Sequence, residues 1–196
     1  VPSRQFDISK IDFELLSREF AYTRRKNLLL RDLDELVNQQ LAKMLFANPQ
    51  RIDYYDRYQE IIDAYNAEQN RATIEKTFMD LMELASSLDT EQQRYVREGF
   101  SSDEELSVYD LLFSENLTKQ EIETIKKVSV DLLTKIKQQI AKLDHWTDKQ
   151  ETKAIVDNLI RNTLWQELPN SYDVSDIQTY QKKIYEYVYM RYPEVA

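Results

Sequence analysis

Hydrophobic side chains recur at three- and four-residue steps along most of this chain. A repeat near 3.6 residues places such positions on one face of an α-helix, whereas a half-buried strand requires strict alternation. Between about 27 and 47 the recurring positions are Leu33, Val37, Leu41, Met44 and Leu45. Between 118 and about 143 they are Ile122, Ile125, Ser129, Leu132, Ile136, Ile140 and Leu143. The pattern therefore predicts amphipathic helices and no strand.

Turn and capping residues divide this pattern into elements. Asn48-Pro49 ends one helix and starts the next, because proline disfavours the helical conformation of the preceding residue and suits a first turn. Possible capping boxes, with a hydroxyl three residues before Glu or Gln, are Thr90/Gln93, Ser102/Glu105, Thr118/Glu121 and Thr147/Gln150. Gly99 suits the residue just past a helix end. Helices are expected over about 12–24, 27–47, 71–88, 118–143, 148–167 and 175–192, and also after Pro49, Thr90 and Ser102.

The helix after Pro49 has a broad apolar side. Its main stripe is Ile52, Tyr55, Ile62 and Tyr65, widened by Tyr54, Tyr58 and Ile61. We therefore expect an all-α fold, an irregular multi-helix bundle of about eight or nine helices.

The composition supports this prediction and excludes several kinds of site. One glycine in 196 residues leaves little material for turns, and it rules out Walker and Rossmann phosphate loops, which need several. The absence of cysteine excludes disulfides and thiolate sites, and a single histidine excludes two-histidine metal sites and HExxH motifs. No signal peptide or long apolar run is present.

The net charge of −9 is concentrated in the middle of the chain. Residues 89–118 hold 2 basic and 8 acidic side chains, net −6, and a chain with a pI near 4.8 lacks a broad positive field for nucleic acid. We expect a single helical domain over 11–196, with possible lobes 11–88 and 118–196 joined by an acidic helical connection, 89–117. Residues 1–10 are interpreted as a linker remnant.

One catalytic pattern can be tested on geometry. Glu151-Thr152-Lys153, with Asp144 or Asp148 upstream, imitates the acidic-x-Lys signature of restriction-type nucleases. That chemistry needs carboxylates that converge on Mg²⁺. On a helix, Glu151 and Lys153 lie about 200° apart around the axis and cannot converge. We therefore expect no catalytic residue and no metal site in this segment.

Tyrosines are concentrated near the end of the chain. On the last helix Ile177, Tyr180, Ile184 and Val188 form one apolar stripe, while Tyr185, Tyr189 and Tyr192 form a second, about 120° away. Two apolar faces mean either burial on both sides or a face that meets a partner. The sequence leaves both alternatives open.

Several stretches resemble the region that follows the motor domains in restriction (R) subunits of type I restriction-modification enzymes. They are 48–62 (NPQRIDYYDRYQEII), 81–85 (LMELA), 102–113 (SDEELSVYDLLF), the 144–147 junction, 164–177 (LWQELPNSYDVSDI) and 184–192 (IYEYVYMRY). The similarity covers about residues 10–192. His145 departs from the family, in which Asp usually runs directly into Trp.

The resemblance implies the C-terminal helical domain of an ATP-dependent deoxyribonuclease. The parent polypeptide would carry the nuclease and the ATP- and Mg²⁺-dependent motor, so this segment needs no cofactor. The implied role is docking the motor onto the methyltransferase (M) subunit and the M/S complex in the bacterial cytoplasm, with DNA reached through that complex and no membrane contact. Candidate partner-binding residues are Trp165, Pro169, Tyr172, Tyr185, Tyr189 and Tyr192. The alternative is an element that guides duplex DNA to the motor, with phosphate contacts from Arg24, Arg25 and Lys26.

Overall fold

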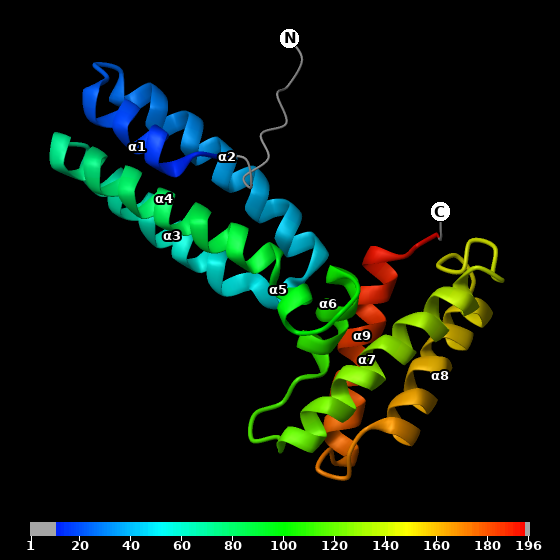
Figure 1. Cartoon of the computed structure of the whole chain (residues 1–196). Coiled ribbons are helices and arrows are strands. Elements are labelled where there is room, and N and C mark those ends of the chain that lie inside the picture. Colours follow the sequence, from blue (N-terminus) through cyan, green and yellow to red (C-terminus); the bar gives the residue numbers. More distant parts are fainter. Residues whose placement is uncertain (1–10, 195–196) are drawn as a thin grey trace. The chain divides into compact units, whose positions relative to one another are not determined.

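The computed structural model describes residues 11–194, and every regular element in that range is a helix (Figure 1). The predicted all-α class is confirmed, with nine α-helices and one 3₁₀ turn in the described range. None of these helices is long and apolar enough to cross a membrane. Contacts divide the chain into two compact units, with the boundary between Arg97 and Glu98. The expected linker remnant, residues 1–10, lies outside the described residues.

The first unit is built on three long helices. Its elements are α1 (Phe13–Tyr22), α2 (Lys26–Ala47), the 3₁₀ turn η2 (Pro49–Arg51), α3 (Ile52–Ala67), α4 (Arg71–Gln92) and the short α5 (Arg94–Arg97). Helix α4 packs along both α2 and α3 (Figure 1). In the core between these helices, α2 buries Leu33, Val37, Leu41 and Met44, as their spacing predicts.

Two details of this unit come from packing. Helix α1 is held by Phe20, whose ring stacks on Phe78 of α4 at 3.7 Å between centroids. On α3 half of the predicted main stripe is wrong, because Ile52 and Tyr55 are exposed, whereas Tyr58 and Ile61 are buried. The other half, Ile62 and Tyr65, packs against the core. A side with seven apolar positions has no unique centre, so the contacts with α4 and α2, including the Tyr58 hydroxyl bond to Asp34, select the buried strip.

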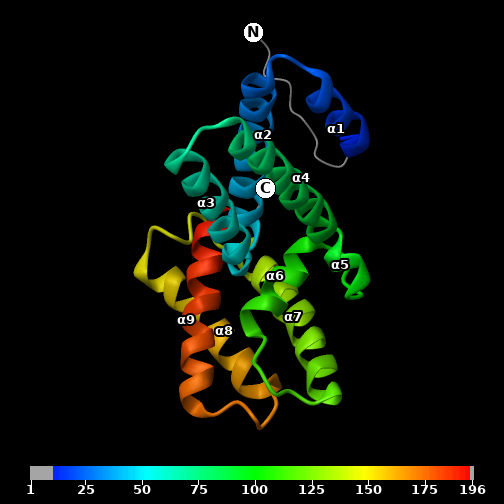
Figure 2. The same cartoon turned by 90° about the vertical axis from the view of Figure 1, so that its left-hand side faces the viewer.

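The second unit is a closed set of four helices. These are α6 (Asp103–Leu112), α7 (Lys119–Ile140), α8 (Gln150–Glu167) and α9 (Val174–Arg191). Helix α7 packs on α6 and α8, and α9 packs on α8 and α6, so each helix contacts two others (Figure 2). Most of the predicted inward face of α7 is confirmed, with Ile125, Ser129, Leu132, Ile136 and Ile140 buried, whereas Ile122 is half-buried and Leu143 lies past the end of the helix.

Two of the four predicted capping boxes mark real helix starts. Thr118 accepts from the Glu121 N–H at 3.2 Å, and Glu121 accepts in return from the Thr118 N–H at 2.8 Å. Ser102 accepts from the Glu105 N–H at 3.3 Å. Gly99, just past α5, has φ +85°, as expected for a residue that follows a helix end.

The other two boxes are wrong. Helix α4 continues to Gln92, and the Thr90 hydroxyl donates to the Ser86 carbonyl inside it. Helix α8 starts at Gln150 after Lys149, which makes no side-chain cap, so Thr147 stays in the preceding loop. Packing of Leu88 and Glu91 carries α4 past the local cap. A genuine box that the hydroxyl pattern missed is Asp173 with Asp176, at the start of α9.

The acidic stretch 89–117 is divided between the two units. The end of α4 and all of α5 belong to the first unit, whereas α6 belongs to the second. Three of its acidic residues, Asp103, Glu104 and Glu105, lie in the first turn of α6, where the helix dipole favours negative charge.

Candidate functional site

Helix α9 carries the two predicted apolar stripes, and the structure shows what covers each. Ile177, Ile184 and Val188 are buried in the second unit, and Tyr180 is half-buried beside Tyr172. Tyr187, which the stripes omitted, is also buried. This stripe therefore forms the packing side of α9.

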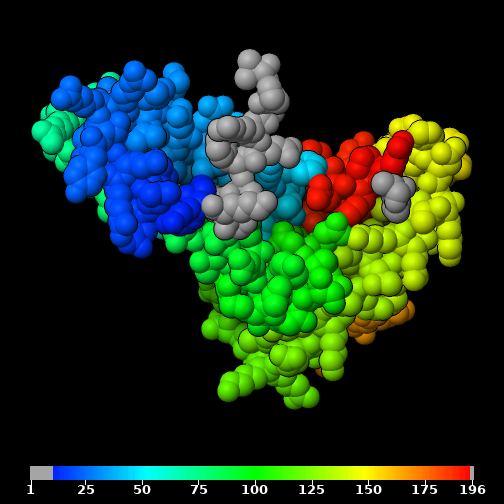
Figure 3. All heavy atoms as spheres, turned by 45° about the horizontal axis from the view of Figure 1, so that its top comes forward, coloured from blue at the N-terminus to red at the C-terminus, as the bar shows by residue number. Residues whose placement is uncertain are grey.

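The second stripe is partly covered by Trp146. This indole is fully buried, in the loop between α7 and α8, and it meets the rings of Tyr185 and Tyr189 edge-on at 6.1 and 5.7 Å. Its Nε1 donates to the Tyr192 carbonyl at 2.7 Å, which satisfies a carbonyl at the end of α9. In Figure 3 this loop, in yellow, lies beside the red C-terminal end of α9. Tyr185 remains half-buried, and Tyr189 is 39% exposed.

A polar groove of about 520 Å³ runs between α8 and α9. Its lining is Gln150, Lys153, Ala154, Asp157, Gln178, Gln181, Lys182 and Tyr185. The Gln181 side-chain amide donates to Asp157 at 3.0 Å across the groove. Burial raises the pKa of Tyr185, and the nearby Asp157 carboxylate raises it further. The groove thus has a neutral phenol at one end and lysines of both helices along it.

Two exposed apolar side chains lie beyond the groove at the end nearer the turn between α8 and α9. Trp165, 49% exposed, lies about eleven residues beyond Ala154 and so on the same side of α8. Val174, at the start of α9, is exposed one turn before Gln178. We call Trp165, Val174, Tyr185, Tyr189 and the groove between them the α8–α9 face.

Other predicted partner-binding residues lie inside the second unit. Tyr172 is buried, and its hydroxyl donates to the Leu112 carbonyl at 2.6 Å. Tyr192 is buried against Tyr187. Burial raises the pKa of both Tyr172 and Tyr192. These two tyrosines stabilise the core and present no surface, while Pro169 is half-buried in the α8–α9 turn.

The predicted basic cluster lies at the turn between α1 and α2. Arg24 and Arg25 are exposed. Lys26 points back into the fold, where its Nζ donates to the Phe20 carbonyl at 2.7 Å and lies 4.3 Å from the centre of the Phe20 ring. Lys26 therefore helps to satisfy the C-terminal end of α1, and only the two arginines extend toward solvent.

The nuclease-like residues do not converge. Glu151 and Lys153 occupy the first turns of α8, as expected. Within residues 11–194, no three His, Cys, Asp or Glu side chains come close enough to hold a metal ion. His145 is exposed, with Nδ1 3.0 Å from the Glu194 carboxylate.

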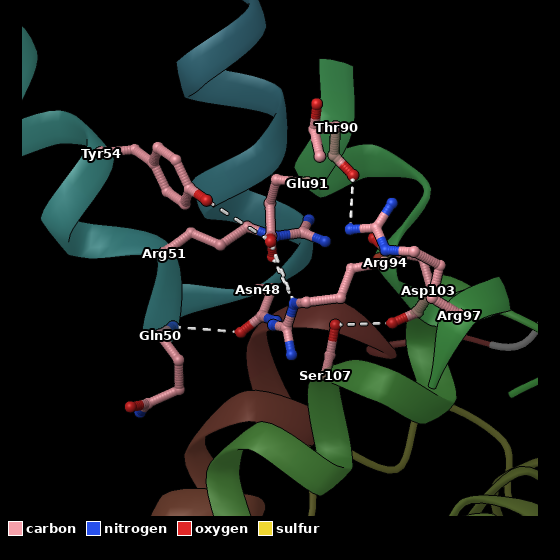
Figure 4. A network of polar contacts seen from close by, with 10 residues as sticks. All are labelled: Asn48, Gln50, Arg51, Tyr54, Thr90, Glu91, Arg94, Arg97, Asp103 and Ser107. Atoms are coloured by element: carbon pink, nitrogen blue, oxygen red, sulfur yellow. Dashed lines mark hydrogen bonds and ion pairs between the residues drawn. The ribbon is translucent and has the colours of Figure 1, made fainter. Parts of the chain in front are cut away.

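The segment 48–62, which is one of the stretches that resemble the R-subunit family, makes buried contacts that stabilise the first unit. Asn48 is buried and its side chain accepts from the Gln50 N–H. Arg51, also buried, donates to Glu91 at 3.1 Å, and Arg94 donates to the same carboxylate at 3.0 Å (Figure 4). Tyr54 donates to it at 3.5 Å. The sequence does not reveal this cluster, because forty residues separate Arg51 from Glu91 and no local pattern joins them.

The chain is similar to one described protein family. Residues 3–192 match the model of a family described as type I restriction enzyme HindI endonuclease subunit-like, C-terminal. No curated protein and no solved structure matches the chain significantly.

Proposed function

This chain belongs to the family of C-terminal regions of HindI-like type I restriction endonuclease subunits, and from that membership we propose that it is a non-catalytic assembly module. In this proposal it docks the ATP-dependent translocase and endonuclease onto the methyltransferase core. The partner is the M subunit within the M/S complex. The catalytic residues, ATP and Mg²⁺ belong to the rest of the polypeptide, DNA is reached through the complex, and the assembly works in the cytoplasm.

The observation that carries the proposal is the exposed aromatic pair of the α8–α9 face. Trp165 and Tyr189 stay 49% and 39% exposed, and they flank the groove on the same side of the unit, whereas other exposed apolar side chains, such as Phe113 and Met190, do not line it. Tryptophan and tyrosine bury large area on association and keep one polar group satisfied, which is why they dominate binding hot spots. The groove between them is lined mostly by glutamine, lysine and aspartate side chains, and polar side chains of this kind surround the apolar centre of typical interfaces.

The experiment is binding of this chain to purified M/S complex, followed by calorimetry and gel filtration. We expect a stable complex at micromolar concentration, with Trp165→Ala and Tyr189→Ala each weakening binding at least about tenfold. Tyr22→Ala is the matched control, because Tyr22 is an exposed aromatic residue of the first unit. The proposal would be contradicted if the chain kept its helices but formed no complex. It would also be contradicted if all variants bound the M/S complex with equal affinity.

The alternative is a DNA-guiding element, favoured only by the exposed pair Arg24 and Arg25. It requires duplex DNA to bind this chain with a steep salt dependence that Arg24→Ala and Arg25→Ala reduce. The net charge of −9 opposes such binding. We expect no measurable DNA affinity at physiological salt in the same preparation that binds M/S complex.

A further inference from the structure

A second, chemically different groove lies on the first unit, between α1 and α2. Its volume is about 400 Å³. Its lining comprises Ile11, Asp12, Leu15, Leu16, Glu19, Leu29, Asp32, Leu33 and Leu36. It shares no residue with the α8–α9 face.

The groove has the geometry of a helix-binding site. Positions 12, 15, 16 and 19 of the α1 segment and 29, 32, 33 and 36 of α2 follow the same i, i+3, i+4, i+7 spacing. Each stripe thus extends about 10 Å along its helix, or two turns. Leucines occupy five of these eight positions and carboxylates the other three, so the two stripes offer an apolar floor with an acidic edge. Such a groove can accept the apolar face of a third helix, whose anchors are spaced i, i+3, i+4 and i+7.

The floor of the groove is the outer layer of the hydrophobic core. Leu33 is buried, and Leu16, Leu29 and Leu36 are partly buried against it. Leu15, by contrast, is 53% exposed. An occupant would remove the exposed part of these leucines from water without rearranging the core, and that is a favourable transfer.

The rim of the groove is acidic. Its charged lining residues are Asp12, Glu19 and Asp32, all exposed, and no lysine or arginine is part of the lining. Asp12 accepts from the Leu15 N–H as the cap of α1, and Arg18 on the neighbouring face is paired with Glu14. Carboxylates only accept hydrogen bonds, so the rim selects a cationic occupant.

From the paired stripes and the acidic rim we infer that the α1–α2 groove is a docking site for a basic amphipathic helix of a partner protein. Its leucine-like anchors lie on the groove floor, and its lysine or arginine side chains lie against Glu19 and Asp32. This site is additional to the one proposed on the second unit, and neither requires the other.

The test is fluorescence anisotropy of the whole chain with a labelled amphipathic peptide about four helical turns long. The probe carries leucines at i, i+3, i+4 and i+7, with lysines beside them. A matched peptide carries glutamates in place of the lysines. We expect the lysine peptide to bind at least about tenfold more tightly, and to weaken as salt rises because the rim charges are exposed.

Substitutions in the groove separate its two components. Leu15→Ser should weaken binding of the lysine peptide at least about tenfold, because it removes an apolar contact. Met79→Ser, on the exposed side of α4, should leave that binding unchanged. Asp32→Lys and Glu19→Lys should move the preference toward the glutamate peptide. Glu60→Lys, an equal charge change on α3, should leave it unchanged. Circular dichroism checks that each variant keeps its helices.

Several results would overturn the inference. Equal binding of the two peptides would mean unspecific apolar adhesion, and equal loss in the control variants would place binding elsewhere. If the peptide bound only after removal of residues 1–10, the occupant would be the chain itself. If the chain formed a dimer in sedimentation and Leu15→Ser abolished that dimer, the occupant of the groove would be a second copy of the chain. The M/S binding experiment is unaffected by these outcomes, because its variants lie on the α8–α9 face.

Discussion

At the scale of single residues, the structure depends on a buried charge that the sequence does not reveal. Glu91 is buried on α4 and accepts from both Arg51 and Arg94. Burial raises the pKa of Tyr54 beside it, and the Glu91 charge adds to this, so Tyr54 remains a neutral donor. Buried ion pairs add little net stability, but breaking one leaves a desolvated charge behind.

Glu91→Gln should therefore lower the free energy of unfolding by about 3 kcal/mol, since the buried Arg51 guanidinium loses the Glu91 carboxylate. Urea unfolding followed by circular dichroism measures the loss. Glu83→Gln is the matched control on the same helix. Its exposed pair with Arg57 should be worth less than about 1 kcal/mol. Equal losses in the two variants would show that Glu91 is not effectively desolvated.

His145 illustrates a backbone cost at a single residue. Its φ is +47°, in the left-handed region, and Asn116 is the other non-glycine residue of residues 11–194 with positive φ. Asparagine adopts that region readily, whereas the left-handed backbone conformation of histidine costs conformational free energy. His145→Gly should raise stability by about 1 kcal/mol despite losing the exposed contact with Glu194. His145→Val should lower it, since a branched side chain fits positive φ poorly. A thermal melt of the three proteins tests the order.

At the scale of elements, helix ends depend on whether a local hydrogen bond agrees with packing. Thr118 and Asp173 each make both bonds of a capping box, at α7 and α9. Thr90 has the same sequence pattern but lies inside α4 and bonds backward to Ser86. The same sequence pattern therefore stabilises a helix start at Thr118 but not at Thr90.

Thr118→Ala should cost about 1 kcal/mol of stability, because it leaves the Glu121 N–H without its cap. Thr90→Ala should change stability by less than about 0.5 kcal/mol, since its hydroxyl closes no helix end. Denaturant unfolding of both variants makes the comparison. A larger loss at Thr90 than at Thr118 would contradict the assignment of helix ends.

At the scale of the whole molecule, each unit has its own core, and the second unit can be observed separately. Both tryptophans of the chain, Trp146 and Trp165, lie in it. Burial acts to raise the pKa of Glu104, but its hydrogen bond with Lys137, together with other groups, outweighs this and lowers it overall. The pKa of Glu121 is lowered by the Thr118 N–H, and that of Asp131 by Lys135.

These lowered pKa values predict an acid-sensitive second unit. Each carboxyl binds protons more readily when unfolded, so its stabilisation is present above its ordinary pKa, near 4.5 for glutamate, and is lost as pH falls through the lowered folded value. We expect the tryptophan-detected melting temperature to fall between about pH 5 and pH 3. Glu104→Gln should melt lower at pH 7 and show a shallower fall. A Glu104→Gln profile parallel to that of the natural chain would exclude this carboxyl as a cause.

Much of the fold can be predicted because it depends on neighbours three or four residues apart. Stripes such as Leu33–Met44 and the inward face of α7 follow from helical periodicity alone. The candidate face is only half predictable. Trp165, Tyr185 and Tyr189 remain partly or largely accessible, but Tyr172 and Tyr192 are buried by contacts with groups that are distant in sequence.

By itself, the sequence determined the helical class, most helix boundaries and the family, since short-range spacing and ordered motifs encode them. Only the tertiary structure decided how far the tyrosine stripe of α9 is covered, because Trp146, which lies 46 residues before Tyr192, bonds to the Tyr192 carbonyl and packs on Tyr185 and Tyr189. It also decided that Arg51 pairs with Glu91 and that α1 and α2 leave an acidic groove open. The physical reason is that burial and charge pairing depend on distances in space, which local periodicity does not contain.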